Sequence, residues 1–292
     1  MTWKTKGFNF IKEFFEKSTE GNSASWRISH AYIFSGQEMI GKRTFALELA
    51  NRINKAADTD IHPDIFTVDP SSSESGESIP IEQIRNAKNF LSLSAYSGPY
   101  KFVIINDAEK MTAESQNAFL KILEEPSDSS IIILVSAYPD ELLPTITSRC
   151  QEIKFSNHSI KDIKKILLEE DITEERAEFL GEFVNGRLGL ALKIVRENLY
   201  DKVKKHLSEL ADLKKASLND KLKIAQALNS EEGNVVLREK ILFWMLYLRM
   251  TALKKLSYDS AKTLSYLIEL NYVLGQPQFN RRLMLENFMV KM

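Results

Sequence analysis

The sequence predicts a doubly wound α/β domain followed by a region built only of helices. Short apolar segments alternate with helical patterns through the first part of the chain, an arrangement typical of a parallel sheet with helices on both faces. Two of these segments, residues 101–105 and 131–135, are dominated by continuous apolar runs, as expected of strands buried on both sides. From Ser156 onward, only helical periodicity remains.

Length and composition are those of a multidomain cytoplasmic protein. The 292 residues are enough for two or three domains, and the 43% hydrophobic content is enough for several cores. The sequence contains no apolar run near the roughly twenty residues of a membrane helix, and its start lacks the apolar segment of a signal peptide. The net charge of -1 gives no overall basic surface, so contact with nucleic acid would be local or shared with partner subunits.

The ligands for a protein-bound metal are scarce. Cys150 is the single cysteine, which excludes a disulfide within the chain and a zinc site with several cysteines. The four histidines are scattered without metal-ligand spacing and are interpreted as ordinary histidines. We therefore expect no resident metal, and any Mg²⁺ would arrive together with a nucleotide.

The first domain is predicted to contain five strands joined by helices. One helix carries apolar residues at i, i+3, i+4 and i+7 from Ala46. A second begins after Pro80, and a third begins at Thr112 as N-cap and is stopped by Pro126. The serine-rich residues 70–78 are interpreted as a loop without regular structure. The predicted strands are residues 31–34, 65–68, 101–105, 131–135 and 151–155.

The helical pattern divides the chain into three predicted domains, residues 1–156, 157–200 and 201–292. The second domain contains three short amphipathic helices, and the third contains longer helical patterns. An aromatic group in the third domain is interpreted as core or helix–helix contact and not as a platform on which bases stack. This group consists of Phe243, Trp244 and Tyr247.

A candidate phosphate loop follows the first predicted strand. Gly36, Gly41 and Lys42 have the spacing GxxxxGK, in which glycines let backbone N–H groups approach phosphate oxygens and the lysine neutralises them. The pattern alone is weak, but a strand precedes it, a helix follows it, and a carboxylate, Asp107, follows a second buried strand. This arrangement predicts a nucleoside triphosphate site at the carboxyl edge of the sheet.

The same loop departs from a working nucleotide site. The residue after Lys42 should carry a hydroxyl for Mg²⁺, but it is Arg43, and Thr44 lies one residue late, about 100° around the helix. Asp107 takes the position associated with Mg²⁺, but Ala108 follows it in place of a glutamate. Capping of the following turn is an alternative role for the acidic residues. The sequence leaves two outcomes, weak binding of ATP with Mg²⁺ or complete loss of binding.

With these residues in place, the chain resembles the AAA+ clamp-loader subunits of bacterial DNA polymerase III, and among them the delta-prime type. The matching segments cover residues 30–155 strongly, and residues 280–289 look like the last helix of the family's collar domain. The segments that carry the resemblance are HAYIFSG at 30–36, IxxIR at 81–85, residues 101–111, SxNAFLKILEEP at 115–126 and SRC at 148–150.

The resemblance implies three domains and one functional arginine. It implies an AAA+ P-loop NTPase-like domain with a five-stranded parallel sheet, a small helical lid and an all-α collar domain that oligomerises. In this family ATP lies between neighbours, and the arginine of the SRC motif, here Arg149, reaches the adjacent subunit's site. Such an arginine finger is worth about 10³ to 10⁵ in rate in GTPases. The alternative is that Arg149 forms a local salt bridge or anchors its loop.

The resemblance also separates two types of subunit. Degenerate nucleotide sites are common in the delta-prime type, so Arg43 and Ala108 favour it over the ATP-hydrolysing gamma/tau-type motor subunit. Motor subunits carry a sensing arginine in the lid, at the place that Gly189 takes here, and Arg187 lies on another side of the predicted helix. Residues 51–62 contain none of the four cysteines that often bind zinc in the family, so no zinc is expected.

The function favoured by the resemblance is that of a subunit of the DNA polymerase III clamp loader, which takes part in DNA replication. The chain would not be catalytic alone, and it would help to open and load the sliding clamp on primed DNA. Its partners would be the gamma/tau and delta subunits, bound through the collar and AAA+ faces, with no membrane involved. One alternative is an ATPase in its own right, in which Lys42 and Asp107 would support the binding of Mg²⁺ with ATP without a hydroxyl ligand. A monomeric DNA-binding helical protein is disfavoured by the near-zero net charge.

Overall fold

The computed structural model describes residues 3–19, 28–55, 62–73, 76–127, 129–231, 234–255, 258–274 and 279–292. Its contacts divide the chain into two compact units. The first unit is Met1–His158 together with Arg187–Gly189, and the second is Ser159–Gly186 together with Leu190–Met292.

The first unit is built on a five-stranded parallel sheet, which confirms the predicted α/β fold. The strand order is β2-β5-β6-β1-β7, and each neighbouring pair is parallel. Because parallel neighbours need crossover connections, the helices between them cover both faces of the sheet. The strands are β1 (Ala31–Ser35), β2 (Ile65–Val68), β5 (Lys101–Ile105), β6 (Ser130–Ser136) and β7 (Gln151–Lys154).

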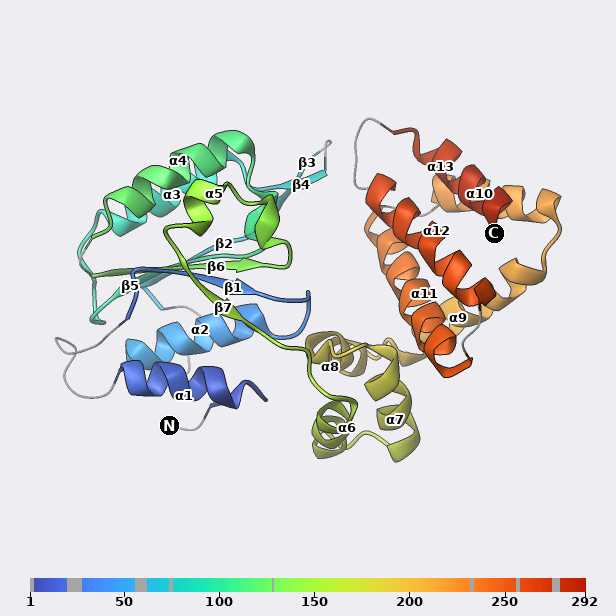
Figure 1. Cartoon of the computed structure of the whole chain (residues 1–292), viewed down its shortest axis with the longest axis horizontal. Coiled ribbons are helices and arrows are strands. Elements are labelled where there is room, and N and C mark those ends of the chain that lie inside the picture. The colour runs from blue at the N-terminus through green and yellow to red at the C-terminus, as the bar shows by residue number, and fades with distance from the viewer. Residues whose placement is uncertain are drawn as a thin grey trace. The chain divides into compact units, whose positions relative to one another are not determined.

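Side chains of the central strands alternate between two hydrophobic cores. On β5, Phe102 and Ile104 enter the core shared with α1 and α2, whereas Val103 and Ile105 enter the core on the side of α3 and α4. Figure 1 shows α1 and α2 on one face of the sheet and α3 and α4 on the other. The helices of this unit are α1 (Asn9–Ser18), α2 (Lys42–Ile53), α3 (Ile81–Leu91), α4 (Ala113–Glu124) and α5 (Pro144–Thr147).

Two segments differ from the sequence prediction. The interpretation of residues 70–78 as an irregular loop is wrong in part, because β3 (Ser71–Ser73) pairs antiparallel with β4 (Gly76–Ser78). This pairing joins main-chain groups, so a serine-rich segment forms it without the apolar alternation that predicts strands. The connection after β6 also contains a 3₁₀ helix, Pro139–Glu141, and the short helix α5.

The regular elements in the described part of the second unit are helices, as the periodicity predicts. Phe243 and Trp244 are 1% and 2% exposed, and Tyr247 packs against the core that contains Trp244. The core interpretation of this aromatic group is therefore confirmed. The helices from residue 160 onward are α6 (Ile160–Glu169), α7 (Glu174–Phe183), α8 (Leu188–Arg196), α9 (Tyr200–Lys215), α10 (Leu218–Glu231), α11 (Asn234–Lys255), α12 (Tyr258–Leu274) and α13 (Arg281–Lys291).

The start of α4 has the side-chain cap that the sequence predicts. The hydroxyl oxygen of Thr112 accepts a hydrogen bond from the backbone N–H of Ser115 at 3.2 Å. It thereby satisfies one of the donors left free at a helix N-terminus. At the start of α7, Thr173 occupies the same position without a side-chain hydrogen bond.

We predict that Thr112→Ala lowers the free energy of unfolding by about 1 kcal/mol, because the capping hydrogen bond is lost. Thr173→Ala is the matched control, and its effect should stay within about 0.5 kcal/mol. Denaturant unfolding of the two variants beside the parent chain measures the difference. Equal losses in the two variants would contradict the assignment of the cap.

Candidate functional site

The carboxyl ends of β1, β5 and β6 form one edge of the sheet. β6 pairs with both other strands, and its residues Leu134 and Ser136 lie opposite Ile105 of β5 and Ser35 of β1. The candidate phosphate loop leaves β1 directly after Ser35, and Asp107 follows β5 by two residues. Loop and carboxylate therefore lie at the same edge of the first unit.

The first glycine of the loop is required by the backbone. Gly36 has φ of 136°, a conformation that other residues rarely adopt. A Cβ atom at this position would also lie 2.5 Å from the carbonyl oxygen of Phe155, which follows β7. The second glycine, Gly41, is also left-handed and precedes the first residue of α2. The loop is thus a tight turn between strand and helix, as its spacing predicts.

Lys42 is turned into its own loop. Its ammonium group donates hydrogen bonds to the carbonyl oxygens of Gly36 at 2.5 Å and Gln37 at 2.8 Å. The residue is only 5% exposed. Burial lowers the pKa of Lys42, and the negative charges of Glu109, Glu38 and Asp107 oppose that shift. Two of the three N–H donors of the Lys42 ammonium group are therefore bonded to the loop and are not free to bind a phosphate.

The residue after Lys42 points to a different partner. The guanidinium group of Arg43 forms an ion pair with Asp69, which follows β2, at 2.7 Å between Nη2 and Oδ2. Thr44 is exposed on the next position of α2. The position at which a hydroxyl would hold Mg²⁺ carries a cation instead.

The acidic residues after β5 lie in a 3₁₀ helix, Ala108–Lys110. Asp107 has a left-handed φ of 46° and contacts Lys110 at 3.4 Å. Its side chain forms no cap hydrogen bond at this turn. Glu109 accepts a hydrogen bond at Oε1 from the N–H of Ala137, beyond β6, at 3.1 Å. Among the described residues, its buried Oε2 has no hydrogen-bond partner.

A further carbonyl oxygen of the loop is engaged by a residue that the sequence did not single out. The ring of His158 donates from Nε2 to the carbonyl oxygen of Ile40 at 3.1 Å. The His158 ring lies against the ring of Phe8, with 4.7 Å between centroids. Both contacts depend on tertiary packing, so local sequence patterns give no signal for them.

Residues 187–189 lie against the same loop. The backbone N–H of Gly189 donates to the carbonyl oxygen of Met39 at 2.7 Å, and a Cβ atom at Gly189 would lie 2.6 Å from that oxygen. Burial raises the pKa of Tyr138, as do the charges of Glu38 and Glu109, whereas the charge of Arg187 opposes the shift. The charge of Arg187 thus reaches Tyr138, whereas the family resemblance places the sensing position at Gly189.

Lys42 and the residue after it differ here from a site that holds a triphosphate with bound Mg²⁺. Protein donors engage the carbonyl oxygens of Gly36, Gln37, Met39 and Ile40. The lysine is one of those donors, and Arg43 replaces the hydroxyl ligand. In the described residues we find no group of three or more His, Cys, Asp or Glu side chains that could hold a metal ion.

Arg149 lies immediately beyond α5, away from the phosphate loop in sequence. Its Nη1 donates to the carbonyl oxygen of Thr145 at 2.9 Å, and its Nη2 contacts Oε1 of Glu124, at the end of α4, at 3.0 Å. The side chain is 39% exposed. The local salt bridge that the sequence left as an alternative is present, and the guanidinium group still faces solvent.

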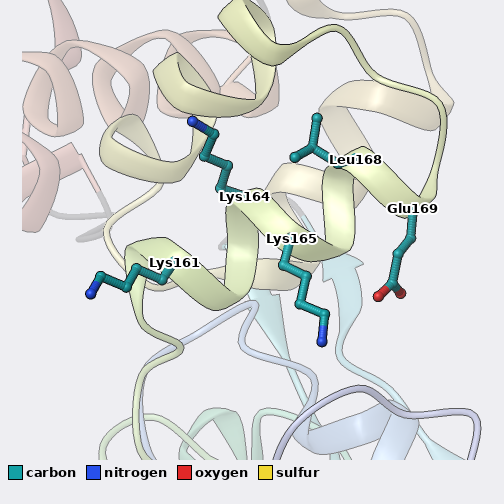
Figure 2. A pocket seen from close by; sticks show the side chains of 5 residues that line it. All are labelled: Lys161, Lys164, Lys165, Leu168 and Glu169. Atoms are coloured by element: carbon teal, nitrogen blue, oxygen red, sulfur yellow. The ribbon is translucent and has the colours of Figure 1, made fainter.

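The remaining surface features lie elsewhere. A pocket on α6 is lined by Lys161, Lys164, Lys165, Leu168 and Glu169, whose side chains Figure 2 shows, and it contains none of the residues predicted for the site. The segments described by the structure include no helix with the length and apolar character needed to span a membrane.

The sheet order and the loop at its carboxyl edge define an AAA+ type of P-loop domain, here followed by helices. The chain belongs to the family described as DNA polymerase III, delta subunit, which matches residues 11–159.

Two curated relatives are DNA polymerase III delta' subunits. The Bacillus subtilis protein is 34% identical over 174 residues, covering 54% of this chain and 52% of the relative. The Pseudomonas aeruginosa protein is 36% identical over 140 residues, covering 42% of each chain. The chain thus spans about half the length of the curated relatives it matches. These relatives support its place among the delta-prime subunits.

A solved structure extends the similarity of fold over the rest of the chain. The DNA polymerase III gamma subunit-related protein of Thermotoga maritima is 23% identical and covers 96% of both chains with a TM-score of 0.53. This similarity shows the fold, an AAA+ domain with a helical region after it.

We predict that the thiol of Cys150, next to Arg149, is unreactive in the folded chain. Burial raises the pKa of Cys150 from 9.0 to about 12, so the thiolate fraction near pH 8 falls by roughly a thousandfold. Alkylation by iodoacetamide, followed by mass spectrometry, should be slower by about that factor than in the urea-unfolded chain. The rate should keep rising with pH beyond 9. Similar rates in the folded and unfolded chains would contradict the burial of this thiol.

Proposed function

We propose that this chain is a delta-prime-like subunit of a clamp loader that supplies Arg149 to a neighbouring ATPase subunit and hydrolyses no ATP itself. A contrast within the first unit carries this proposal. The ammonium group of Lys42 is hydrogen-bonded to its own phosphate loop, whereas the side chain of Arg149 is 39% exposed. The chain therefore lacks a fitting nucleotide site of its own but retains a cation for another site.

The partners proposed for this role are the gamma/tau and delta subunits, bound through the helices α9–α13 and the faces of the AAA+ domain. Ile268 and Tyr272, one turn apart on α12, are 56% and 69% exposed. Exposed apolar side chains at this spacing support a protein contact on the collar. The assembled complex, and not this chain alone, would bind the sliding clamp and primed DNA, because a net charge of -1 gives the chain no overall basic surface.

One observation favours a second candidate, an ATP-hydrolysing motor subunit. Glu109 lies at the edge with Lys42, and its buried Oε2 has no hydrogen-bond partner among the described residues. Unpartnered buried carboxylate oxygens occur where a ligand or water completes the site. The missing hydroxyl at Arg43 and the engaged ammonium of Lys42 weigh against this candidate.

We predict that the purified chain shows no Mg²⁺-dependent ATP binding in calorimetry and no ATP turnover. Arg43→Thr restores the hydroxyl but leaves Lys42 bonded to the loop, so this variant should bind no better than the parent chain. Turnover by the chain alone, abolished in Lys42→Ala, would establish the motor candidate instead.

We predict that Arg149→Ala leaves the chain folded but lowers DNA-stimulated ATP hydrolysis of the reconstituted assembly by at least about tenfold. The expected loss is a conservative part of the 10³ to 10⁵ that arginine fingers contribute in GTPases. The fold should persist because the ion pair with Glu124 is half-exposed, and such pairs contribute about 0 to 1 kcal/mol.

Arg85→Ala is the matched control for this variant. Arg85 is also an exposed arginine paired with a glutamate, Glu82, in the same unit. Its replacement should leave hydrolysis unchanged. Undiminished hydrolysis by the Arg149→Ala assembly would contradict the assignment of Arg149 as an arginine finger.

A further inference from the structure

Arg149 is folded back onto its own subunit. Thr145, whose carbonyl oxygen accepts from Nη1, lies in α5, four residues before Arg149. Glu124, which contacts Nη2, belongs to α4, the helix that precedes β6 in the chain. Two donors of the guanidinium group are thus engaged by the chain that carries it. A side chain in this conformation has to leave at least one of these partners before it can extend into a neighbouring molecule.

The position of Glu124 explains why it holds a cation. Glu124 is the last residue of α4, and the exposed Glu125 follows it as C-cap. The carboxyl end of a helix carries partial negative charge. Two carboxylates at this end therefore repel one another and destabilise the helix. Arg149 is the cation that the structure places against Glu124. The pair therefore relieves an unfavourable concentration of negative charge.

The exposure of the pair makes it exchangeable. The side chains of Arg149 and Glu124 are 39% and 51% exposed, so solvent screens their attraction. A phosphate group offers more negative charge and more acceptor oxygens than one carboxylate contact. The guanidinium group can therefore be transferred from carboxylate to phosphate with a small cost.

We propose that Glu124 is a positioning residue that holds Arg149 in a folded-back conformation and competes with the neighbouring subunit's ATP for it. This inference rests on the proposed function, which gives Arg149 its partner in the assembly. Glu124 touches no substrate in this role and acts only through Arg149. Removing its charge should make Arg149 more available.

The test compares Glu124→Gln with Glu125→Gln in the reconstituted assembly with clamp and primed DNA. The two variants remove the same charge from adjacent positions, but only Glu124 contacts Arg149 in the described structure. We expect Glu124→Gln to raise kcat/KM for ATP by twofold to about fivefold, the upper value corresponding to about 1 kcal/mol. Glu125→Gln should leave it unchanged. An unchanged or lowered kcat/KM in Glu124→Gln, or the same rise in both variants, overturns the proposal.

A second measurement on the isolated full chain needs no catalysis. In NMR spectra of ¹⁵N-labelled protein, the guanidinium protons of Arg149 should exchange with water faster in Glu124→Gln than in Glu125→Gln, because one acceptor is lost. Equal exchange rates would overturn the contact itself.

The two proposals fail in distinguishable ways. If Arg149→Ala abolishes hydrolysis but Glu124→Gln has no effect, Arg149 is still the arginine finger and the proposed role of Glu124 is wrong. Unchanged hydrolysis in Arg149→Ala removes the proposed function itself. In the combined variant Glu124→Gln with Arg149→Ala, hydrolysis should equal that of Arg149→Ala alone, since Glu124 acts only through the arginine.

Discussion

The parallel pairing of β5, β6 and β1 determines where every candidate functional side chain of the first unit lies. Each of these strands is buried along its whole length, so its register is fixed by the two cores that it separates. The fixed register brings the ends of the three strands to one edge, with the phosphate loop after Ser35 and the acidic turn after Ile105. The chemistry of this edge is then decided by a few side chains and not by the fold.

At that edge, the phosphate loop provides hydrogen-bond partners for its own lysine. A buried ammonium group is costly unless it is hydrogen-bonded, and Lys42 meets this requirement with two carbonyl oxygens of its own loop. His158 and Gly189 engage two more of the loop's carbonyl oxygens. A ligand phosphate would have to replace protein partners at Lys42 without the hydroxyl-bound Mg²⁺ that stabilises such a complex elsewhere. This is the physical basis of the proposal that the chain binds no nucleotide of its own.

The sequence predicted what depends on local pattern and missed what depends on packing. Apolar runs and, for residues 151–155, apolar alternation located the five strands of the main sheet, and Thr112 located the start of α4, because burial and capping leave signals within a few residues. The antiparallel pairing of residues 71–73 with residues 76–78 has no such signal, since main-chain hydrogen bonds hold it. The contacts of His158 and Gly189 with the loop join residues far apart in sequence. The salt bridge of Arg149 was foreseen as an alternative, but its partner Glu124 was not.

Lys42 and Arg149 show how burial divides two cations between different roles. Lys42 is 5% exposed, and its hydrogen bonds replace the hydration that it has lost, so moving the ammonium group within the folded chain would break both of these hydrogen bonds. Arg149 is 39% exposed, and water can solvate both the guanidinium group and Glu124 once they separate. A cation that can leave its partner at a small cost in free energy can act on a second molecule. A cation whose displacement costs more free energy stabilises its own loop. The exposed arginine is therefore the better candidate for a functional charge, even though the lysine occupies the more recognisable motif.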